Sequence, residues 1–216
     1  MSSYTVDGQL VMIPFANRDA APCRYSINMQ VICDNDKRIT AIFIGYPGSC
    51  ADSTVFKKTP IYRKPTDYFS KGQYLMADSA YSLTHNCIPA YKAPTANLQE
   101  NTEFNYCLAR SRVRNENCIG ILKGRFASLQ EMRQQIRNVN DMRIIIDWTV
   151  ACCVLHNMLA CLGDQWDDMY TDKPDEVPQV SENVANGTRE TFREAVKKIT
   201  LETNYAKGVL PIRHGA

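Results

Sequence analysis

The sequence predicts a mixed α/β fold in which a small sheet is flanked by helices. Three runs rich in β-forming residues come first along the chain, and a fourth, shorter run follows later. Apolar residues at helical spacing lie between the third and fourth runs and fill much of the chain after them. With 216 residues, of which 44% are hydrophobic and 22% charged, the chain can bury a core without disulfide bonds. We therefore expect one folded domain with additional terminal material.

The first three strands are predicted at residues 4–13, 25–33 and 38–46. The segment Asp34-Asn35-Asp36-Lys37 joins the second strand to the third as a hairpin turn, and Pro47-Gly48-Ser49 ends the third strand. This order of strands and turns favours a three-stranded antiparallel meander.

Helical spacing replaces the strand pattern after the third strand. Residues 52–61 show near-helical spacing, and Asp52 or Ser53 is placed to cap a short helix there. A brief, apolar fourth strand is predicted at residues 73–77, and it runs directly into Asp78.

Three longer helices are predicted in the second half of the chain. A looped section containing Pro89 precedes the first helix, which begins near Gln99 and carries Glu116. The second helix, from about Met142 to Leu162, is apolar almost all round and is therefore expected to be buried. The third helix, at residues 189–205, combines mixed charge with one apolar side.

These elements divide the chain into three parts. Residues 1–162 are predicted to form one domain. Residues 163–186 are acidic, contain Pro174 and Pro178, and lack apolar periodicity, so a flexible or extended linker is expected there. Residues 187–216 then hold the final helix and a tail.

Charge is unevenly distributed along the chain, although the formal net charge is only +2. Residues 104–143 contain eight basic and three acidic residues, whereas residues 163–182 contain seven acids and one lysine. The net charge alone does not identify a nucleic-acid partner. A contact with nucleic acid is therefore sought on the basic segment.

The cysteines and the apolar runs indicate the compartment. Nine cysteines are an odd number at irregular spacings without a Cys-x-x-Cys, and the three histidines are far apart in sequence. This pattern is typical of reduced thiols rather than of disulfides or a zinc site. No secretory leader precedes Met1, and no apolar run reaches the roughly 18 residues that span a bilayer, so we expect a soluble intracellular protein. Within the apolar helix, His156 is expected to be a hydrogen-bonded core residue, and Cys152-Cys153 small core residues.

Three acids fall at positions where a fold of this kind can bring them together. Asp7 lies in the first strand, Asp78 closes the fourth, and Glu116 lies on the long helix. Two divalent ions held about 4 Å apart by carboxylates can activate water and stabilise the departing oxygen of a phosphodiester. The same acids also fit ordinary roles at a strand end, in a turn and on a solvated helix face. Spacing alone favours those ordinary roles.

Six short motifs in a fixed order over residues 6–158 favour the catalytic interpretation. They are Val6-Asp7-Gly8, Tyr25-Ser26-Ile27-Asn28, Pro47-Gly48-Ser49-Cys50-Ala51-Asp52, Ala77-Asp78-Ser79-Ala80-Tyr81, the helix from Phe104-Asn105 through Arg112 and Glu116 to Leu122-Lys123 and Arg125-Phe126, and Cys152-Cys153-Val154-Leu155-His156-Asn157-Met158. Together they resemble the DDE transposases of the Harbinger type and the nuclease domesticated from them.

The resemblance implies a ribonuclease-H-like mixed sheet, with the three-stranded meander and the further strand flanked by helices. By this resemblance Asp7, Asp78 and Glu116 are the catalytic triad that binds Mg²⁺ or Mn²⁺. Asp52 is then a fourth acid near the same metal site, although a helix-capping role explains it equally well.

The resemblance also implies DNA as the substrate. Arg110, Arg112, Arg114, Lys123 and Arg125 flank Glu116 on the predicted helix, where a bound DNA strand would meet them. A solvated basic face explains any single one of these residues equally well. A Myb-like DNA-binding partner protein, a homo-oligomer and a nuclear location, with the cytoplasm as a second compartment, are further expectations. No membrane partner is expected.

Some features depart from the family pattern. Gly8 is followed by Gln9-Leu10 where the family usually has Thr-His, and Met1 begins only six residues before Asp7. The helical N-terminal region of the family is therefore missing from this sequence. Two hypotheses remain open: a metal-dependent nuclease, or a truncated or domesticated relic that binds DNA or protein without catalysis.

Overall fold

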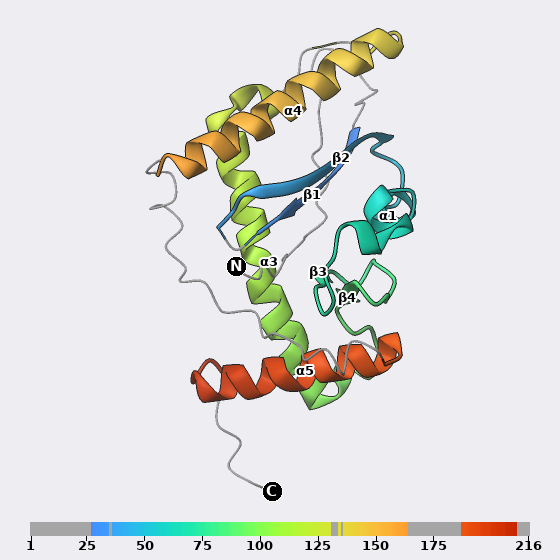
Figure 1. Cartoon of the computed structure of the whole chain (residues 1–216), viewed down its shortest axis with the longest axis vertical. Coiled ribbons are helices and arrows are strands. Elements are labelled where there is room, and N and C mark those ends of the chain that lie inside the picture. Colours follow the sequence, from blue (N-terminus) through green and yellow to red (C-terminus); the bar gives the residue numbers. More distant parts are fainter. Residues whose placement is uncertain (1–26, 35, 131–133, 135, 164–186, 211–216) are drawn as a thin grey trace, which may run out of the picture.

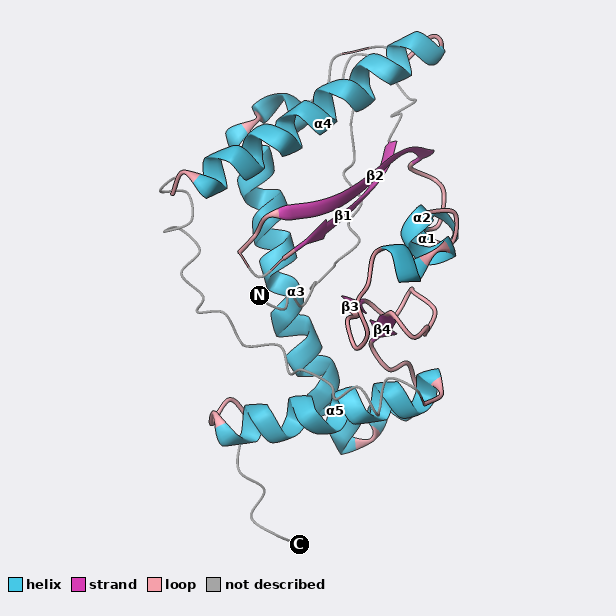
Figure 2. Ribbon diagram, viewed as in Figure 1, coloured by secondary structure: helices cyan, strands magenta, loops and turns pink. Residues whose placement is uncertain are grey.

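A computed structural model describes residues 27–34, 36–130, 134, 136–163 and 187–210 (Figure 1). The strands are β1 (Ile27–Cys33), β2 (Ile39–Pro47), β3 (Leu75–Ala77) and β4 (Cys87–Pro89). The helices are α1 (Asp52–Phe56), α2 (Pro60–Arg63), α3 (Gln99–Arg125), α4 (Val139–Cys161) and α5 (Arg189–Ala206), with short 3-10 turns at Pro65–Asp67, Thr95–Asn97 and Ala127–Leu129. Helix α3 runs through the middle of the molecule, α4 crosses it near one end and α5 near the other (Figures 1 and 2).

The predicted hairpin is confirmed as an antiparallel pair of β1 and β2, with Ile27 opposite Pro47. Its turn is built on Asp34, whose Oδ1 accepts hydrogen bonds from the backbone amides of Asp36 and Arg38, each at 2.9 Å. Lys37 takes a positive φ of 59° there, which completes the reversal of the chain.

Strand β1 is buried along its whole length because it lies between two layers of the core. Side chains alternate between the two faces of a strand. Met29 and Val31 pack in a cluster with residues of α3 and α4, whereas Ile32 packs with Phe56 of α1. The second face also carries the buried polar residues of the site described below.

The sheet differs from the predicted three-stranded meander with a fourth strand beside it. In the described part of the chain β1 pairs with β2, and β3 pairs in parallel with β4 in a separate two-stranded sheet. The first predicted strand, residues 4–13, lies outside the described residues. β4 falls in the section predicted as a loop, because a three-residue strand ending in Pro89 has too few residues to show a strand pattern. The mixed α/β class is confirmed.

The helix predicted at residues 52–61 is two short helices, α1 and α2. Pro60 is the first residue of α2, where its missing N–H costs nothing. Thr59 separates the two helices: its hydroxyl donates to the Phe56 carbonyl at 2.6 Å and accepts from the Tyr62 amide at 3.3 Å.

Helix α3 begins at Gln99, as predicted, and its first half shares a core cluster with α5 and the β3–β4 sheet. That cluster includes Phe104 and Leu108 of α3 with Phe192 and Val196 of α5. The predicted C-terminal helix is confirmed as α5, which therefore packs directly on the domain that carries the acids.

Helix α4 was predicted to be buried, and that prediction is wrong for one side of it. Ile145, Thr149 and Cys152-Cys153 face the core, as expected for the cysteine pair, but eight large apolar residues at and near α4 are not covered by the described chain. α4 is also the one described helix that is long and apolar enough to cross a bilayer, a test that a core helix of a soluble protein passes as well. Apolar periodicity alone did not reveal that only one face meets the core.

Two polar residues, His156 and Asn157, connect the end of α4 to the β1–β2 hairpin through hydrogen bonds. Asn157 donates to the Ile39 carbonyl at 2.7 Å and accepts from the Ile39 amide at 2.8 Å. The His156 ring lies 3.1 Å from Arg125 Nη1 through Nδ1 and 3.0 Å from the Lys37 carbonyl through Nε2. A guanidinium can only donate, so Nδ1 accepts and Nε2 carries the proton. The prediction of a hydrogen-bonded core histidine is confirmed.

Candidate active site

The structure describes three of the four acids assigned to the site by the sequence. Asp52 is the first residue of α1, Asp78 follows β3 directly, and Glu116 lies in α3. Asp7 lies outside the described residues, so its predicted place in the site is untested.

Asp52 is held against the polar face of β1. The side-chain amide of Asn28 donates to Asp52 Oδ1 at 2.7 Å, and that of Gln30 donates to the Asp52 main-chain carbonyl at 2.8 Å. The N-cap of α1 is Ala51, without a side-chain capping bond, so the prediction that Asp52 or Ser53 caps the helix is wrong. The carboxylate turns to β1 because buried polar groups need hydrogen-bond partners.

Asp78 connects the end of β3 to α3. Its Oδ1 accepts from the Ala80 amide at 2.6 Å, and its Oδ2 lies 4.0 Å from Nη2 of Arg112. These two side chains are 34% and 26% exposed, so the ion pair adds little to stability. The ion pair matters because it places Arg112 of α3 beside the Asp78 carboxylate.

The buried Tyr81 hydroxyl lies near both acids. Burial raises the pKa of Tyr81, and the charges of Asp52 and Asp78 raise it further, while Arg112 acts in the opposite direction. The Tyr81 ring packs edge to face against Phe56, with 5.6 Å between ring centroids. Tyr81 also packs in one core cluster with Phe56 of α1 and Ala77 of β3, so the segments that carry Asp52 and Asp78 adjoin at this residue.

Three buried oxygen atoms of this cluster have no hydrogen-bond partner among the described residues. They are Asn28 Oδ1, Gln30 Oε1 and the Tyr81 hydroxyl. Leaving such an atom unsatisfied costs about 1–3 kcal/mol, so proteins rarely keep several of them together without a use for them. Their chemistry fits a water, a cation or a polar substrate group as the partner.

Glu116 lies one helical turn beyond Arg112, on the same side of α3, and its side chain is exposed. Asp52 and Asp78 thus lie on segments that adjoin at Tyr81, and Glu116 lies one turn from the arginine that contacts Asp78. Within the described residues, no group of three potential ligands is assembled closely enough to hold a metal ion.

The five basic residues predicted to meet DNA do not share one face. Arg110 is exposed, and Arg112 is beside Asp78. Lys123 is half-buried, and burial lowers its pKa. Arg125 contacts His156 in the core. The side chain of Arg114 lies outside the described residues. Arg112 is thus the member of the set that the structure connects to the acids.

Asn28 and Tyr81 belong to the sequence motifs, whereas Gln30 lies outside them. The signal that identifies the strand residues is their spacing. Asn28 and Gln30 occupy alternate positions, hence one face, of a strand whose remaining residues are apolar. A polar pair on one face of such a strand indicates a buried polar site.

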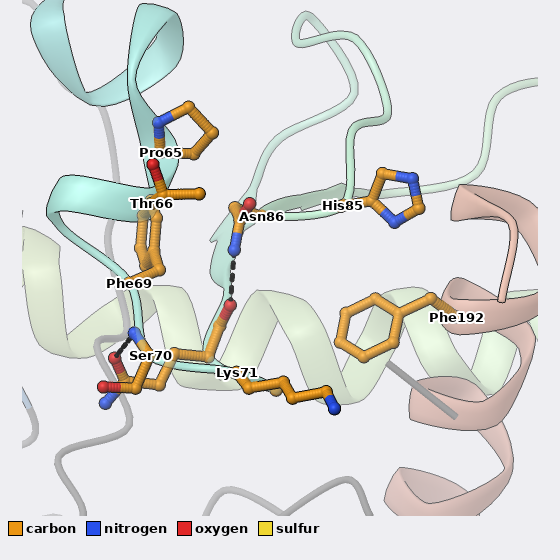
Figure 3. Close-up of a pocket in the computed structure, with 10 residues that line it drawn as sticks. Pro65, Thr66, Phe69, Ser70, Lys71, His85, Asn86 and Phe192 are labelled. Carbon is orange, nitrogen blue, oxygen red and sulfur yellow. Dashed lines mark hydrogen bonds between the residues drawn. The ribbon is translucent and has the colours of Figure 1, made fainter. Parts of the chain in front are cut away.

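A separate cleft of about 380 Å³ opens between residues 65–73, the β3–β4 connection and α5 (Figure 3). Lys71 and His85 are its ionisable lining residues, and Phe192 forms one wall. The Asn86 side chain donates to the Gln73 carbonyl at 2.9 Å and so holds two of its sides together. None of the predicted catalytic or DNA-binding residues lines this cleft.

The mixed α/β fold thus carries two acids on adjoining segments, with a basic residue of α3 beside one of them. A family comparison identifies the class of protein. Residues 22–157, more than half of the chain, match the family model described as DDE superfamily endonuclease, and the chain belongs to this family. Neither the search of curated proteins nor the search of solved structures gave a match.

Family membership implies a ribonuclease-H-like fold, a DNA substrate and the use of divalent metal ions. The matched residues include Asp52, Asp78 and Glu116, whereas Asp7 precedes them. The match confirms the DDE superfamily part of the resemblance drawn from the motifs.

Proposed function

We propose that this protein is a Harbinger-type nuclease that cleaves DNA by in-line attack of water or a 3′-hydroxyl on a phosphodiester. The observation that carries the proposal is the packing of Tyr81 between the helix that Asp52 begins and the strand that Asp78 follows, with Arg112 of α3 beside Asp78. The match to the DDE superfamily endonucleases supports it independently.

Asp7 joins this site if residues 4–13 form the strand that the sequence predicts. In the described part of the chain, β1 and β3 each have a single partner strand, β2 and β4 respectively. The mixed sheet of a ribonuclease-H-like fold, which family membership implies, has more strands than either of these two-stranded sheets.

The donor chemistry fits a hard divalent cation. Carboxylates of Asp7, Asp78 and Glu116 would hold Mg²⁺ or Mn²⁺, with Asp52 as a fourth acid, and all of these ligands are oxygens. When bound, the ions supply an activated water and stabilise the departing oxygen. The unpartnered oxygens of Asn28 and Gln30 add to the oxygen-rich character of the cluster.

The other side chains of the site have supporting roles in this proposal. Asn28 orients the Asp52 carboxylate through its amide, at 2.7 Å. Arg112 balances the charge of Asp78 and lies where a phosphate of the substrate would approach. Arg110, exposed on the same helix, is placed to contact phosphate outside the site.

The proposed nuclease domain comprises residues 1–162. It is followed by an acidic linker at residues 163–186 and by the C-terminal helix and tail at residues 187–216. A nuclear location, a Myb-like DNA-binding partner and an oligomeric enzyme belong to the same proposal. The alternative is a relic that keeps the fold and binds DNA or protein without cleaving.

Metal-dependent nicking of supercoiled DNA tests the proposal directly. With the full chain and Mg²⁺ or Mn²⁺, Asp78→Asn is expected to lower the nicking rate at least about a thousandfold, because one carboxylate ligand is lost. Asp67→Asn is the matched control, since Asp67 is an exposed aspartate of the same region outside the acid cluster. Its rate should equal that of the wild type.

The outcomes separate the nuclease from the relic. Nicking by the wild type that Asp78→Asn abolishes and Asp67→Asn leaves intact supports the enzyme. Equal inactivity of wild type and Asp78→Asn, with both metals and with a Myb-like partner added, contradicts it. DNA binding that persists in the inert protein would then favour the relic.

A further inference from the structure

Five of the eight exposed large apolar residues at and near α4 form one row. Ile144, Trp148, Leu155, Met158 and Leu162 are 58%, 51%, 47%, 56% and 80% exposed. Ala151 lies in the same row and is exposed as well. We call these six residues the α4 stripe.

The spacing of the α4 stripe is that of a helix-pairing seam. Successive members are four, three, four, three and four residues apart, which is the alternation that keeps apolar side chains on one line of an α-helix. Side chains spaced in this way fit between those of a second helix. A strand or a flat surface has no matching row of holes.

The opposite side of α4 packs against the core, so α4 cannot rotate to bury the α4 stripe. Ile145 and Cys152 lie in the core, and Asn157 is bonded to the backbone of β2. A side chain at Gly45 of β2 would come within 3.3 Å of Ile146, which shows how closely α4 is seated. Trp148 is fixed at the surface by a 3.0 Å hydrogen bond from Nε1 to the Ser128 hydroxyl.

We propose that the α4 stripe is the interface through which two copies of this chain associate. The occupant must be a helix with an apolar row of its own. Helix α4 of a second copy supplies the matching row.

Charge and area both agree with self-association. The flank of the α4 stripe carries one exposed cation, Arg143, and one exposed anion, Asp147. A helix that lies on a membrane surface carries many Lys and Arg residues on its polar face, whereas a balanced flank does not repel a copy of itself. Five large side chains that are about half exposed offer roughly 600 Å², close to the about 800 Å² per partner of a standard interface.

Such a dimer leaves both candidate active sites open. In Figure 1 α4 is the outermost layer, and the β1–β2 hairpin lies between it and β3. The α4 stripe faces away from the hairpin, since the other side of α4 packs on it.

Analytical ultracentrifugation of the full chain over about 1 to 100 µM tests the interface. The wild type is expected to form dimers, and Leu155→Glu to weaken association about a hundredfold, because it buries a charge in the seam. Val150→Glu is the matched control: it adds the same charge to α4 at an exposed position outside the α4 stripe. It should dimerise like the wild type, and circular dichroism should show all three proteins folded.

Fluorescence provides a second readout that does not depend on a destabilising variant. Trp148 is one of two tryptophans, so Trp166→Phe leaves it as the sole reporter. Its emission should shift to shorter wavelength as dimers form. A wild type that stays monomeric throughout, equal loss of association in Val150→Glu, or a shift seen only with lipid vesicles each overturns the proposal.

Discussion

Polar side chains lie on both sides of the β1–β2 hairpin, and those of His156 and Asn157 differ in their pairing from those of Asn28, Gln30 and Tyr81. On the α4 side, both ring nitrogens of His156 and both ends of the Asn157 amide have partners. On the α1 side, Asn28, Gln30 and Tyr81 each keep one buried oxygen without a described partner. A paired cluster stabilises the fold, whereas an incompletely paired one is free to bind something else.

This comparison separates two kinds of family motif. The closing motif around His156 and Asn157 fastens α4 to the hairpin and touches none of the acids. The motifs that contain Asn28, Asp52 and Tyr81 adjoin: Asn28 binds the Asp52 carboxylate, and Tyr81 packs on Phe56 of the helix that Asp52 begins. Substitutions in the first cluster should change stability, and substitutions in the second should change activity.

The largest effect is expected from His156→Ala. It removes the ring that joins Arg125 to the Lys37 carbonyl and leaves a cavity, so the free energy of unfolding should fall by about 3 kcal/mol. Thermal denaturation measures the change. His85→Ala, an exposed histidine, is the control and should shift the midpoint little. Equal shifts in the two variants would show that the His156 cluster does not support the fold.

Asn28→Ala should produce the opposite pattern. Loss of its bond to Asp52 releases the carboxylate, so nicking is expected to slow about tenfold and to need more Mg²⁺ for half-maximal rate. The unpartnered Asn28 Oδ1 is removed by the same change, which limits the loss of stability to about 1 kcal/mol. Asn97→Ala, at an exposed turn, is the control. A metal requirement identical to the wild type would contradict a positioning role.

Two tyrosines test the same comparison. The Tyr81 hydroxyl has no hydrogen-bond partner among the described residues, whereas the Tyr91 hydroxyl donates to Glu194. Tyr91→Phe should therefore cost about 1 kcal/mol of unfolding free energy, while Tyr81→Phe should be neutral or slightly stabilising. Urea denaturation of both variants gives the two values. A larger cost at Tyr81 would mean that its hydroxyl is already satisfied.

The sequence predicted the fold where local signals decide it. The hairpin, the start of α3 and the span of α5 follow from a turn of Asp and Asn residues and from helical spacing. It failed where tertiary contacts decide. β4 exists only through its pairing with β3, and the break between α1 and α2 depends on Thr59 and Pro60. Periodicity could not reveal which side of α4 meets the core.

The candidate site was predicted in the same uneven way. Asp52 and Asp78 were identified from motifs, and the structure brings the segments that carry them together at Tyr81. The capping role considered for Asp52 was wrong because Asn28 competes for its carboxylate from a strand distant in sequence. Gln30 was missed, since a single polar residue in an apolar strand has no distinctive spacing until its neighbour is considered.

The smallest effect concerns Cys87, which reports on the charge of Asp78. Burial, and then the Asp78 carboxylate, raise the pKa of the Cys87 thiol to about 12. The thiolate is the reactive form, so only about one in ten thousand Cys87 side chains is ionised at pH 8. Iodoacetamide should therefore label the exposed Cys161 long before Cys87, as mass spectrometry of the digested protein would show. In Asp78→Asn the repulsion disappears, and Cys87 should be labelled modestly faster while the rate at Cys161 stays constant. An unchanged Cys87 rate would mean that burial alone protects the thiol and that the Asp78 carboxylate is screened from the cluster.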